Sequence, residues 1–239
     1  MKRLFLISFY CLSLAWVTVA WTPPIAPASA KPTPVHHYSI GEQAAILYDQ
    51  MCLENSGLSR KAFEYAFRGY SKLAAKNKLE QPGILTICDF SQSSNNKRLY
   101  ILDFNNNTLL LNTYVAHGRN SGGEFATRFS NRAESLQSSL GFYVTKDTYM
   151  GEHGLSLKII GMESGFNDKA LRRGIVIHGA SYVEESWLES AKYMGRSYGC
   201  PAVPSTERDY IINTIKKGTC LFIYHPSKTY LKGSKLLKD

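Results

Sequence analysis

The sequence predicts an α+β protein, in which a predominantly β domain follows a short helical segment. Two observations support this prediction. Between Ser39 and Lys76, apolar residues recur at three- and four-residue spacing, which is typical of amphipathic helices. After Pro82-Gly83, short runs rich in β-branched and aromatic residues alternate with clusters of turn-forming residues, which is typical of strands. The 239 residues suffice for one large domain with a helical extension.

The N-terminus has the pattern of a secretory signal peptide over residues 1–30. Lys2 and Arg3 precede an uncharged apolar run over residues 4–20, and Ala28-Ser29-Ala30 has the form of a cleavage site. The alternative is an uncleaved membrane anchor, but the apolar run is near the lower limit for spanning a bilayer. We therefore expect an exported protein of the periplasm or cell envelope, which contacts the membrane only through an uncleaved signal.

The charge balance favours an anionic partner. The chain carries 28 Lys and Arg against 19 Asp and Glu, and loss of Lys2 and Arg3 with the signal leaves a surplus of seven positive charges. Such a surplus suits nucleic acid, a membrane surface or an acidic wall polymer. Export argues against nucleic acid. The sequence does not predict the oligomeric state.

Two helices are expected at the start of the mature chain. Ser39 is an N-cap candidate for a helix over residues 40–55, and Ser59 for a second over residues 60–76. Gly57 lies between them and favours a helical hairpin. The apolar stripe of the second helix predicts a core or docking surface rather than a ligand site.

Strands dominate the rest of the chain. We therefore divide the mature chain into a helical segment, residues 31–82, and a catalytic-type domain, residues 83–239. The first three predicted strands form a β-meander, and a further helix is expected over residues 182–192. The predicted strands cover residues 84–90, 98–104, 108–118, 141–151, 155–163, 174–180 and 220–226.

His178 and Cys200 are the candidate catalytic pair. A buried-strand run delivers His178 at its end, and Cys200 follows a helix and loop later in Ser197-Tyr198-Gly199-Cys200. A thiol with an ordinary pKa of about 8.5 is mostly protonated at neutral pH. A neighbouring imidazole can take that proton and leave a thiolate nucleophile. Taken singly, Cys200 is also compatible with a buried apolar role or a disulfide, and His178 with a structural role at a strand end.

The turn before the cysteine has residues that suit catalysis. Gly199 lets a substrate carbonyl approach the backbone, and the Gly199 and Cys200 N–H groups can hold a developing oxyanion. The Ser197 hydroxyl can bond nearby backbone groups and fix the turn. The combination, rather than any single residue, favours a nucleophilic cysteine.

The order of these motifs resembles the L,D-transpeptidases that carry the YkuD-type catalytic domain, and in particular their murein L,D-transpeptidase branch. The motif is a strand ending in His-Gly, followed by Ser-x-Gly-Cys. The stretches HGRNSGGEFATRFSN, SLGFYVT and GFNDKALRRGIVIHGA add to the resemblance, which extends from Ser59 to about Pro226. It implies a YkuD-like β-sandwich fold. Tyr198, where the family commonly has histidine, and Pro201-Ala202 indicate a divergent branch.

The resemblance also implies an activity. The family's cysteine attacks the carbonyl of the L-centred third residue of a peptidoglycan stem tetrapeptide and expels the terminal D-alanine, and an amine acceptor then resolves the thioester. Carried onto this sequence, Cys200 is the nucleophile and His178 the general base and later acid. Gly179 orients the histidine through its backbone, and the backbone of residues 198–200 lines the oxyanion hole. No metal or organic cofactor is implied.

Other residues are candidates for substrate contacts. Arg196 can grip a stem carboxylate bidentately, and His117 and His153 can border the cleft, with a structural role as the alternative for each histidine. No cysteine or histidine spacing suggests a metal site. The pairing of the remaining cysteines, including a Cys52–Cys88 bridge, stays open.

Three functions remain compatible with the sequence. The first is an L,D-transpeptidase with an amine acceptor. The second is an L,D-carboxypeptidase, in which water resolves the same thioester. The third is a non-catalytic wall-binding module. The acceptor is not determined by the sequence.

Overall fold

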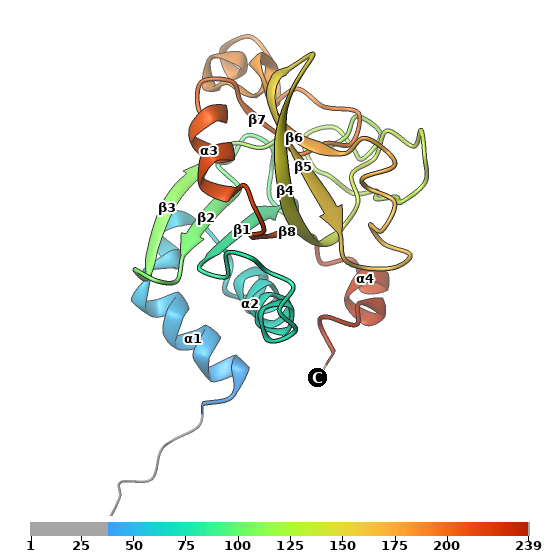
Figure 1. Ribbon diagram of the computed structural model, residues 1–239. Coiled ribbons are helices and arrows are strands. Elements are labelled where there is room, and N and C mark those ends of the chain that lie inside the picture. Colours follow the sequence, from blue (N-terminus) through green and yellow to red (C-terminus); the bar gives the residue numbers. More distant parts are fainter. Residues whose placement is uncertain (1–37, 239) are drawn as a thin grey trace, which may run out of the picture. The chain divides into compact units, whose positions relative to one another are not determined.

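A single hydrogen-bonded sheet of eight strands forms the centre of the protein (Figure 1). The computed structural model describes residues 38–238, so the predicted signal peptide and the start of the helical segment lie outside the described residues. Within residues 38–238, no helix is long and apolar enough to cross a membrane.

The sheet has the order β3-β2-β1-β8-β4-β5-β6-β7. The pairs β1–β8 and β6–β7 are parallel and the other neighbours are antiparallel. The strands are β1 (Ile84–Asp89), β2 (Leu99–Asp103), β3 (Thr108–Thr113), β4 (Gly141–Gly151), β5 (Gly154–Gly161), β6 (Val176–Ala180), β7 (Ala202–Pro204) and β8 (Cys220–Tyr224).

The predicted strands and the meander β1-β2-β3 are confirmed, and so is the α+β class, but the third strand ends at Thr113 and not at residue 118 as predicted. The short edge strand β7 was not predicted. The two edges of the sheet approach each other, because an isolated antiparallel bridge joins Ala116, beyond β3, to Ala202 of β7. The two-layer arrangement that the resemblance implies is thus made by one continuous sheet.

Helices α1 (Ile40–Gln50) and α2 (Arg60–Ala75) confirm the two predicted N-terminal helices, but the first ends at Gln50 and not at residue 55. Cys52, just beyond its end, has a left-handed backbone conformation. Ser39 caps α1 in a capping box with Glu42, and the Ser59 side chain accepts from the Ala62 amide at the start of α2. Between them lies the short 3₁₀ helix η1 (Leu53–Ser56).

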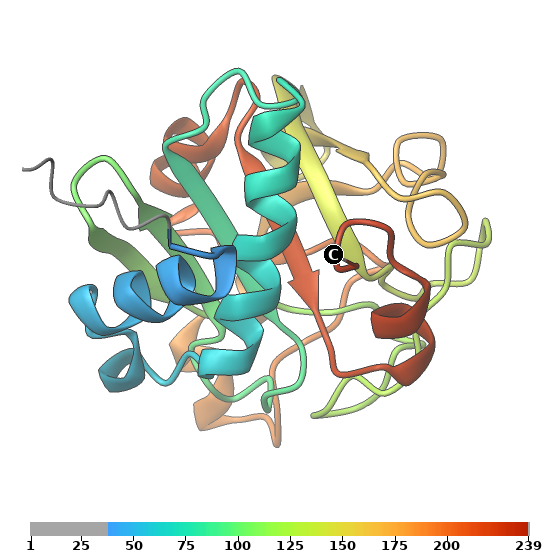
Figure 2. The ribbon, with the colours of Figure 1, turned by 90° about the horizontal axis from the view of Figure 1, so that it is seen from below.

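Helix α2 packs across the face of β1 and β8 (Figure 2). Its buried residues, which include Phe63, Ala66 and Phe67, belong to the same hydrophobic core as strand residues such as Phe142 and Phe222. The helical segment therefore shares its core with the sheet, and the boundary at residue 82 marks a change of secondary structure within one packed unit.

The predicted helix over residues 182–192 is wrong. The chain forms two 3₁₀ helices there, η2 (Ser181–Val183) and η3 (Glu185–Glu189), separated by Glu184 in an extended conformation. No residue of η3 is buried, so no apolar face is available to stabilise a longer helix by packing. Two further helices, α3 (Arg208–Ile215) and α4 (Lys228–Gly233), were not predicted.

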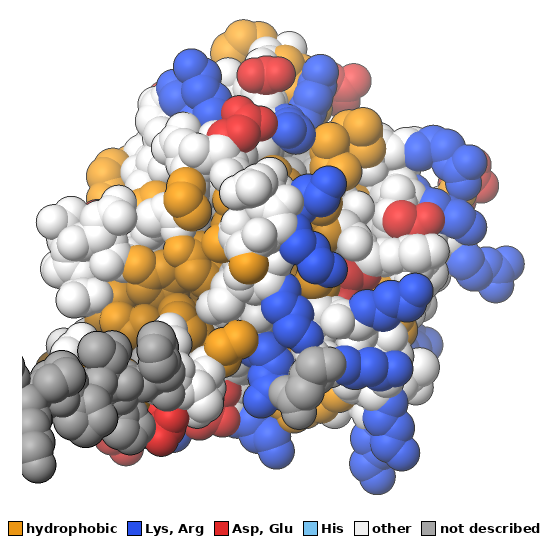
Figure 3. All heavy atoms as spheres, turned by 60° about the horizontal axis from the view of Figure 1, so that its bottom comes forward, with side chains coloured by type: hydrophobic (Ala, Val, Ile, Leu, Met, Phe, Trp, Pro, Cys, Tyr) orange, Lys and Arg blue, Asp and Glu red, His pale blue; other side chains and the backbone are white. Residues whose placement is uncertain are grey.

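The surface is rich in basic side chains, as the net charge requires. On the face shown in Figure 3, Lys and Arg gather in the centre and on the right and clearly exceed Asp and Glu, while a hydrophobic patch lies to their left. The four cysteines of the described residues are free thiols: Cys88 and Cys220 are buried, Cys52 is exposed and Cys200 is half-buried. No disulfide is formed between Cys52 and Cys88 in this structure.

Candidate active site

Cys200 lies directly before β7, beside the start of β6. In the parallel pairing of these strands His178 lies opposite Ala202, so Cys200 comes opposite Val176. The Val176 amide donates to the Cys200 Sγ at 3.4 Å, and the thiol contacts the Gly174 carbonyl oxygen at 3.7 Å. The sheet register therefore fixes the thiol against the backbone that leads to His178.

Ser197 fixes the turn that carries the cysteine, as predicted. Its hydroxyl donates to the Cys200 carbonyl oxygen at 2.6 Å and accepts from the Gly199 amide at 3.1 Å. Gly199 has φ of +124°, and a Cβ built there would lie 2.8 Å from the Gln137 carbonyl oxygen. Glycine is therefore required at this position by both conformation and space.

A neighbouring segment, residues 116–119, supports this turn through the backbone. The Ser197 amide donates to the His117 carbonyl oxygen at 3.0 Å, and the Arg119 amide donates to the Ser197 carbonyl oxygen at 2.7 Å. The Ala116 amide donates to the Ala202 carbonyl oxygen at 2.8 Å. Backbone hydrogen bonds from residues 116–119 therefore hold the cysteine turn on one side, and β6 holds it on the other.

His178 has its tautomer fixed by Gly179. The Nδ1 atom lies 3.0 Å from the Gly179 carbonyl oxygen, which can only accept, so Nδ1 carries the proton. The Nε2 atom is then the unprotonated nitrogen, as a general base requires. Burial lowers the pKa of His178, so the imidazole is neutral at pH 7.

His153 stacks on the ring of His178. It comes from the β4–β5 turn, and the two ring centroids lie 4.4 Å apart with planes 23° from parallel. Its proximity also disfavours a charge on His178, although less than burial does. The predicted place of His153 beside the cleft is therefore what the structure shows.

The oxyanion hole implied by the resemblance needs one adjustment. The Gly199 amide is already bonded to Ser197, so it is not free for a substrate. Among residues 38–238, the Tyr198 and Cys200 amides have no hydrogen-bond partner. These two N–H groups are the ones left to meet an oxyanion.

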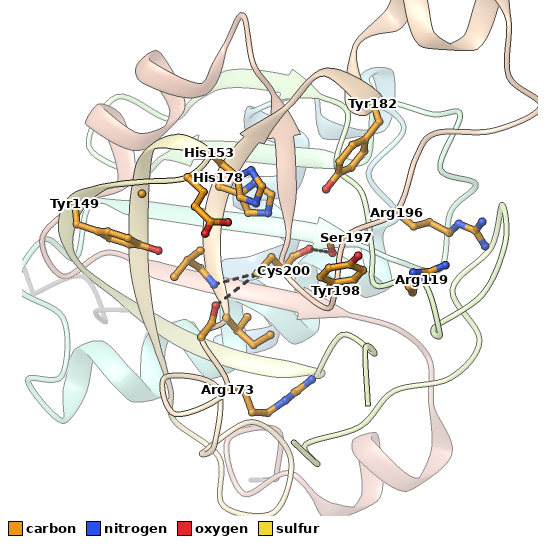
Figure 4. A pocket seen from close by; sticks show the side chains of 15 residues that line it. Arg119, Tyr149, His153, Arg173, His178, Tyr182, Arg196, Ser197, Tyr198 and Cys200 are labelled. Carbon is orange, nitrogen blue, oxygen red and sulfur yellow. Dashed lines mark hydrogen bonds between the residues drawn. The ribbon is translucent and has the colours of Figure 1, made fainter. Parts of the chain in front are cut away.

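A cavity of about 750 Å³ brings these groups together (Figure 4). Of the predicted site residues, Cys200, His178, Ser197, Tyr198, Arg196 and His153 line it. Residues that the sequence did not single out also line it: Arg119, Tyr149, Glu152, Arg173 and Tyr182. Figure 4 shows Tyr149 and His153 on one side of Cys200, and Arg119 and Arg196 on the other, beyond Tyr198.

Residues 54–224 match the family model described as the L,D-transpeptidase catalytic domain. The match covers both the His178–Gly179 pair and the cysteine turn. The chain belongs to the L,D-transpeptidase catalytic domain family.

Three solved structures are similar to this chain at low sequence identity. An L,D-transpeptidase from Mycobacterium smegmatis is 10% identical, with a TM-score of 0.37, and the alignment covers 60% of this chain and 59% of that one. A mutant of the helical cell shape determining protein Pgp2 from Campylobacter jejuni is 14% identical, with a TM-score of 0.38 and coverage of 69% and 55%. An L,D-transpeptidase from Stackebrandtia nassauensis is 13% identical, with a TM-score of 0.34 and coverage of 79% and 78%.

This chain spans 59% of the first of those structures, so that protein's other parts have no counterpart in the alignment. A comparison with curated proteins gave no match. The family assignment therefore rests on the family model, and the chemistry rests on the residues of this chain.

Arg173 is the most informative site residue that the sequence reasoning passed over in this L,D-transpeptidase domain. Its guanidinium donates to the Ser130 and Gln137 carbonyl oxygens at 2.9 and 2.7 Å, and to the Ser135 hydroxyl at 3.1 Å. Burial raises the pKa of the Cys200 thiol, while the Val176 amide and the charge of Arg173 oppose that rise. The position of Arg173, directly before the predicted strand that carries His178-Gly179, is the feature of the sequence from which its place in the site could have been predicted.

His117 does not border the cavity. Its side chain is fully buried and accepts at Nδ1 from the Arg98 guanidinium at 2.8 Å. Burial, with the adjacent Arg98 charge, lowers the pKa of His117 to about 3. The prediction of a substrate contact at His117 is therefore replaced by its structural alternative, since the segment that carries His117 supports the cysteine turn.

Proposed function

We propose that this protein is a cysteine-dependent L,D-transpeptidase that acts on peptidoglycan stem peptides. The observation that carries the proposal is the single cavity that holds the Cys200 thiol, the free Nε2 of His178 and the unpartnered amides of the cysteine turn. Membership of the L,D-transpeptidase catalytic domain family supports the reaction class.

In the first half of the reaction, the Cys200 Sγ attacks the carbonyl carbon of the third residue of a stem tetrapeptide. The thiol proton passes to His178 Nε2 as the C–S bond forms. The Tyr198 and Cys200 amides hold the oxygen as it becomes negative. The C–N bond to the terminal D-alanine then breaks, and the imidazolium returns the proton to the departing nitrogen.

In the second half, the amine of a second stem attacks the thioester. His178 takes a proton from this amine as the new C–N bond forms, the C–S bond breaks, and the sulfur regains a proton. No net oxidation or reduction occurs. Gly179 keeps the imidazole in the required tautomer throughout, because its carbonyl oxygen accepts from Nδ1–H.

Both partners start from their neutral forms. Burial raises the pKa of Cys200 and lowers the pKa of His178, so a resting thiolate–imidazolium pair is disfavoured. Proton transfer therefore accompanies attack on the substrate. Export to the periplasm or cell envelope is part of the proposal, since the substrate lies there and residues 1–30 have the signal pattern.

The test is product analysis by mass after incubation with a disaccharide-tetrapeptide. We expect a cross-linked dimer with loss of D-alanine, and no product from the Cys200→Ser variant. Tripeptide without dimer would instead establish an L,D-carboxypeptidase. Unaltered substrate with the wild-type protein would favour the wall-binding alternative and contradict both enzyme assignments.

A further inference from the structure

A second cavity of about 520 Å³ adjoins the catalytic one. The two cavities share Arg119, Tyr182 and Arg196 in their walls. The second cavity extends past this shared wall to Trp187, Lys192 and Tyr193. Because these side chains line both cavities, a ligand that fills the catalytic cavity lies next to the second one.

The second cavity is electropositive. Arg119, Lys192 and Arg196 line it, and no Asp or Glu among residues 38–238 does so. None of these three cations forms a salt bridge with a described carboxylate. Arg196 makes one hydrogen bond, to the Gly122 carbonyl oxygen at 3.2 Å, which leaves most of its guanidinium donors for a ligand.

The two arginines lie on neighbouring segments of backbone. They come from segments that are hydrogen-bonded to each other, since the Arg119 amide donates to the Ser197 carbonyl oxygen directly after Arg196. The Arg119 guanidinium lies 5.8 Å from the ring centre of Tyr198, and that of Arg196 lies 5.3 Å from the ring centre of Tyr193. Aromatic faces therefore support both guanidinium groups.

We propose that the second cavity binds a carboxylate-bearing segment of the peptide substrate, and that Arg119 and Arg196 hold its carboxylate. Planar guanidinium groups match a carboxylate bidentately. The aromatic rings of Tyr182 and Trp187 cover the apolar part of the same segment. The proposal rests on the proposed function, because that function supplies a peptide to the catalytic cavity.

The carboxylate in question lies away from the reacting carbonyl. Both arginines lie beyond Tyr198 as seen from the thiol (Figure 4). A contact with a part of the substrate that does not react is equally strong in the ground state and the transition state. Its loss therefore raises KM and leaves kcat unchanged.

The test is equilibrium binding by calorimetry to the protein that carries Cys200→Ala. The two ligands are a stem tetrapeptide and the same peptide with its carboxylates amidated. We expect Arg119→Gln and Arg196→Gln each to weaken binding of the free peptide about tenfold, and to leave the weaker binding of the amidated peptide unchanged. Arg132→Gln is the matched control, since Arg132 is exposed and lines neither cavity.

Several results would overturn the proposal: unchanged binding by both arginine variants, equal loss for both peptides, or no binding of either peptide. Tighter binding of inorganic phosphate than of the peptide would assign the cavity to a phosphate-bearing polymer instead. Melting temperatures equal to that of the parent protein exclude misfolding of a variant.

Turnover measured with Cys200 intact separates this proposal from the proposed function. Absence of any product from the wild-type protein contradicts the function, while arginine-dependent binding of the free peptide still supports the second cavity. Where turnover is present, the Arg196→Gln variant must raise KM for the free peptide at constant kcat.

Discussion

Two regions of the molecule bury ionisable groups. In one region the buried group accepts several short hydrogen bonds, and in the other the buried group has few. At the junction of β4 and α4, the Glu163 carboxylate accepts from the Phe142 amide and the Tyr230 hydroxyl, each at 2.8 Å, and from the Ser234 hydroxyl. Around Cys200, the thiol has only two long contacts, and two amides of the turn have no partner among residues 38–238.

The difference separates a structural site from the proposed active site. A buried polar group whose positions are all filled stabilises the fold and offers nothing to a ligand. The Cys200 thiol and the His178 ring line one cavity of about 750 Å³, and the Tyr198 and Cys200 amides have no hydrogen-bond partner among residues 38–238. Under the proposed function, a substrate bound in this cavity supplies partners for these groups.

The largest effect should come from His178, because proton transfer depends on it. We expect His178→Gln to lower kcat/KM for the tetrapeptide between about 10² and 10⁴-fold, with little change in melting temperature. His153→Gln is the comparison, since that ring stacks on His178 in the same cavity, and it should cost less than about tenfold. Equal losses in the two variants would contradict the assignment of His178 as the base.

Substitution of Glu163 should change the stability of the protein and leave the reactivity of Cys200 unchanged. Glu163→Ala leaves three buried donors without an acceptor, so the free energy of unfolding should fall by about 3 kcal/mol in denaturant titrations. The exposed Glu64→Ala is the control. The rate of Cys200 alkylation in the folded variant should stay at its wild-type value, and a large loss of this rate would show that the two regions are coupled.

The pH dependence of the two regions should also differ. Burial raises the pKa of Glu163 above its ordinary value of 4.5, so the folded state binds the proton more tightly than the unfolded state. The stability advantage of wild type over Glu163→Gln should therefore be greatest below pH 4.5 and decline as the pH rises through the raised pKa. Denaturant titrations across this range measure it, and an advantage that grows with pH would contradict the stated cause.

Activity should follow His178 instead. Burial lowers its pKa below 6.5, so the imidazole stays neutral and able to accept a proton until the pH falls through that lowered value. The acid limb of kcat/KM should accordingly have its midpoint below pH 6.5. A midpoint above 6.5 would mean that the resting histidine is stabilised in its charged form.

The smallest effect is expected at Ser197, which has features of both regions. Its hydroxyl is buried and satisfied, yet it shapes the reactive turn. Ser197→Ala should lower the free energy of unfolding by about 1 to 2 kcal/mol and also slow acylation of Cys200. Ser205→Ala, at an exposed position, is the control. Loss of stability with unchanged acylation would show that the turn keeps its shape without the hydroxyl.

The sequence predicted those parts of the fold in which local pattern and packing agree. The capped helices α1 and α2 begin where the spacing of apolar residues predicted, and the apolar strands lie where runs of β-branched and aromatic residues predicted them. The three-residue strand β7 is too short to show a period, and it exists because it pairs with β6 beside the cysteine. The predicted helix after β6 lacked a surface to pack against, which no local pattern reveals.

Some residues of the candidate site were likewise predictable from the sequence, and others were not. The motif order located Cys200, His178 and Gly179, and the backbone contact between the last two is present as the resemblance implies. The fully buried Arg98, which holds His117 away from the cavity, could not be foreseen, because charged residues are rarely buried without a carboxylate partner. Arg119 joined the site only because its segment pairs with Ser197 in the folded chain.

The most direct test of the account is the site of acylation. The protein should be treated with a carbapenem, digested, and read by mass for the modified cysteine. We predict an adduct on Cys200 that is lost in His178→Gln, with Cys88 and Cys220 unmodified because both are fully buried. An adduct on Cys88 or Cys220, or undiminished labelling of Cys200 without His178, would contradict the proposed catalytic pair.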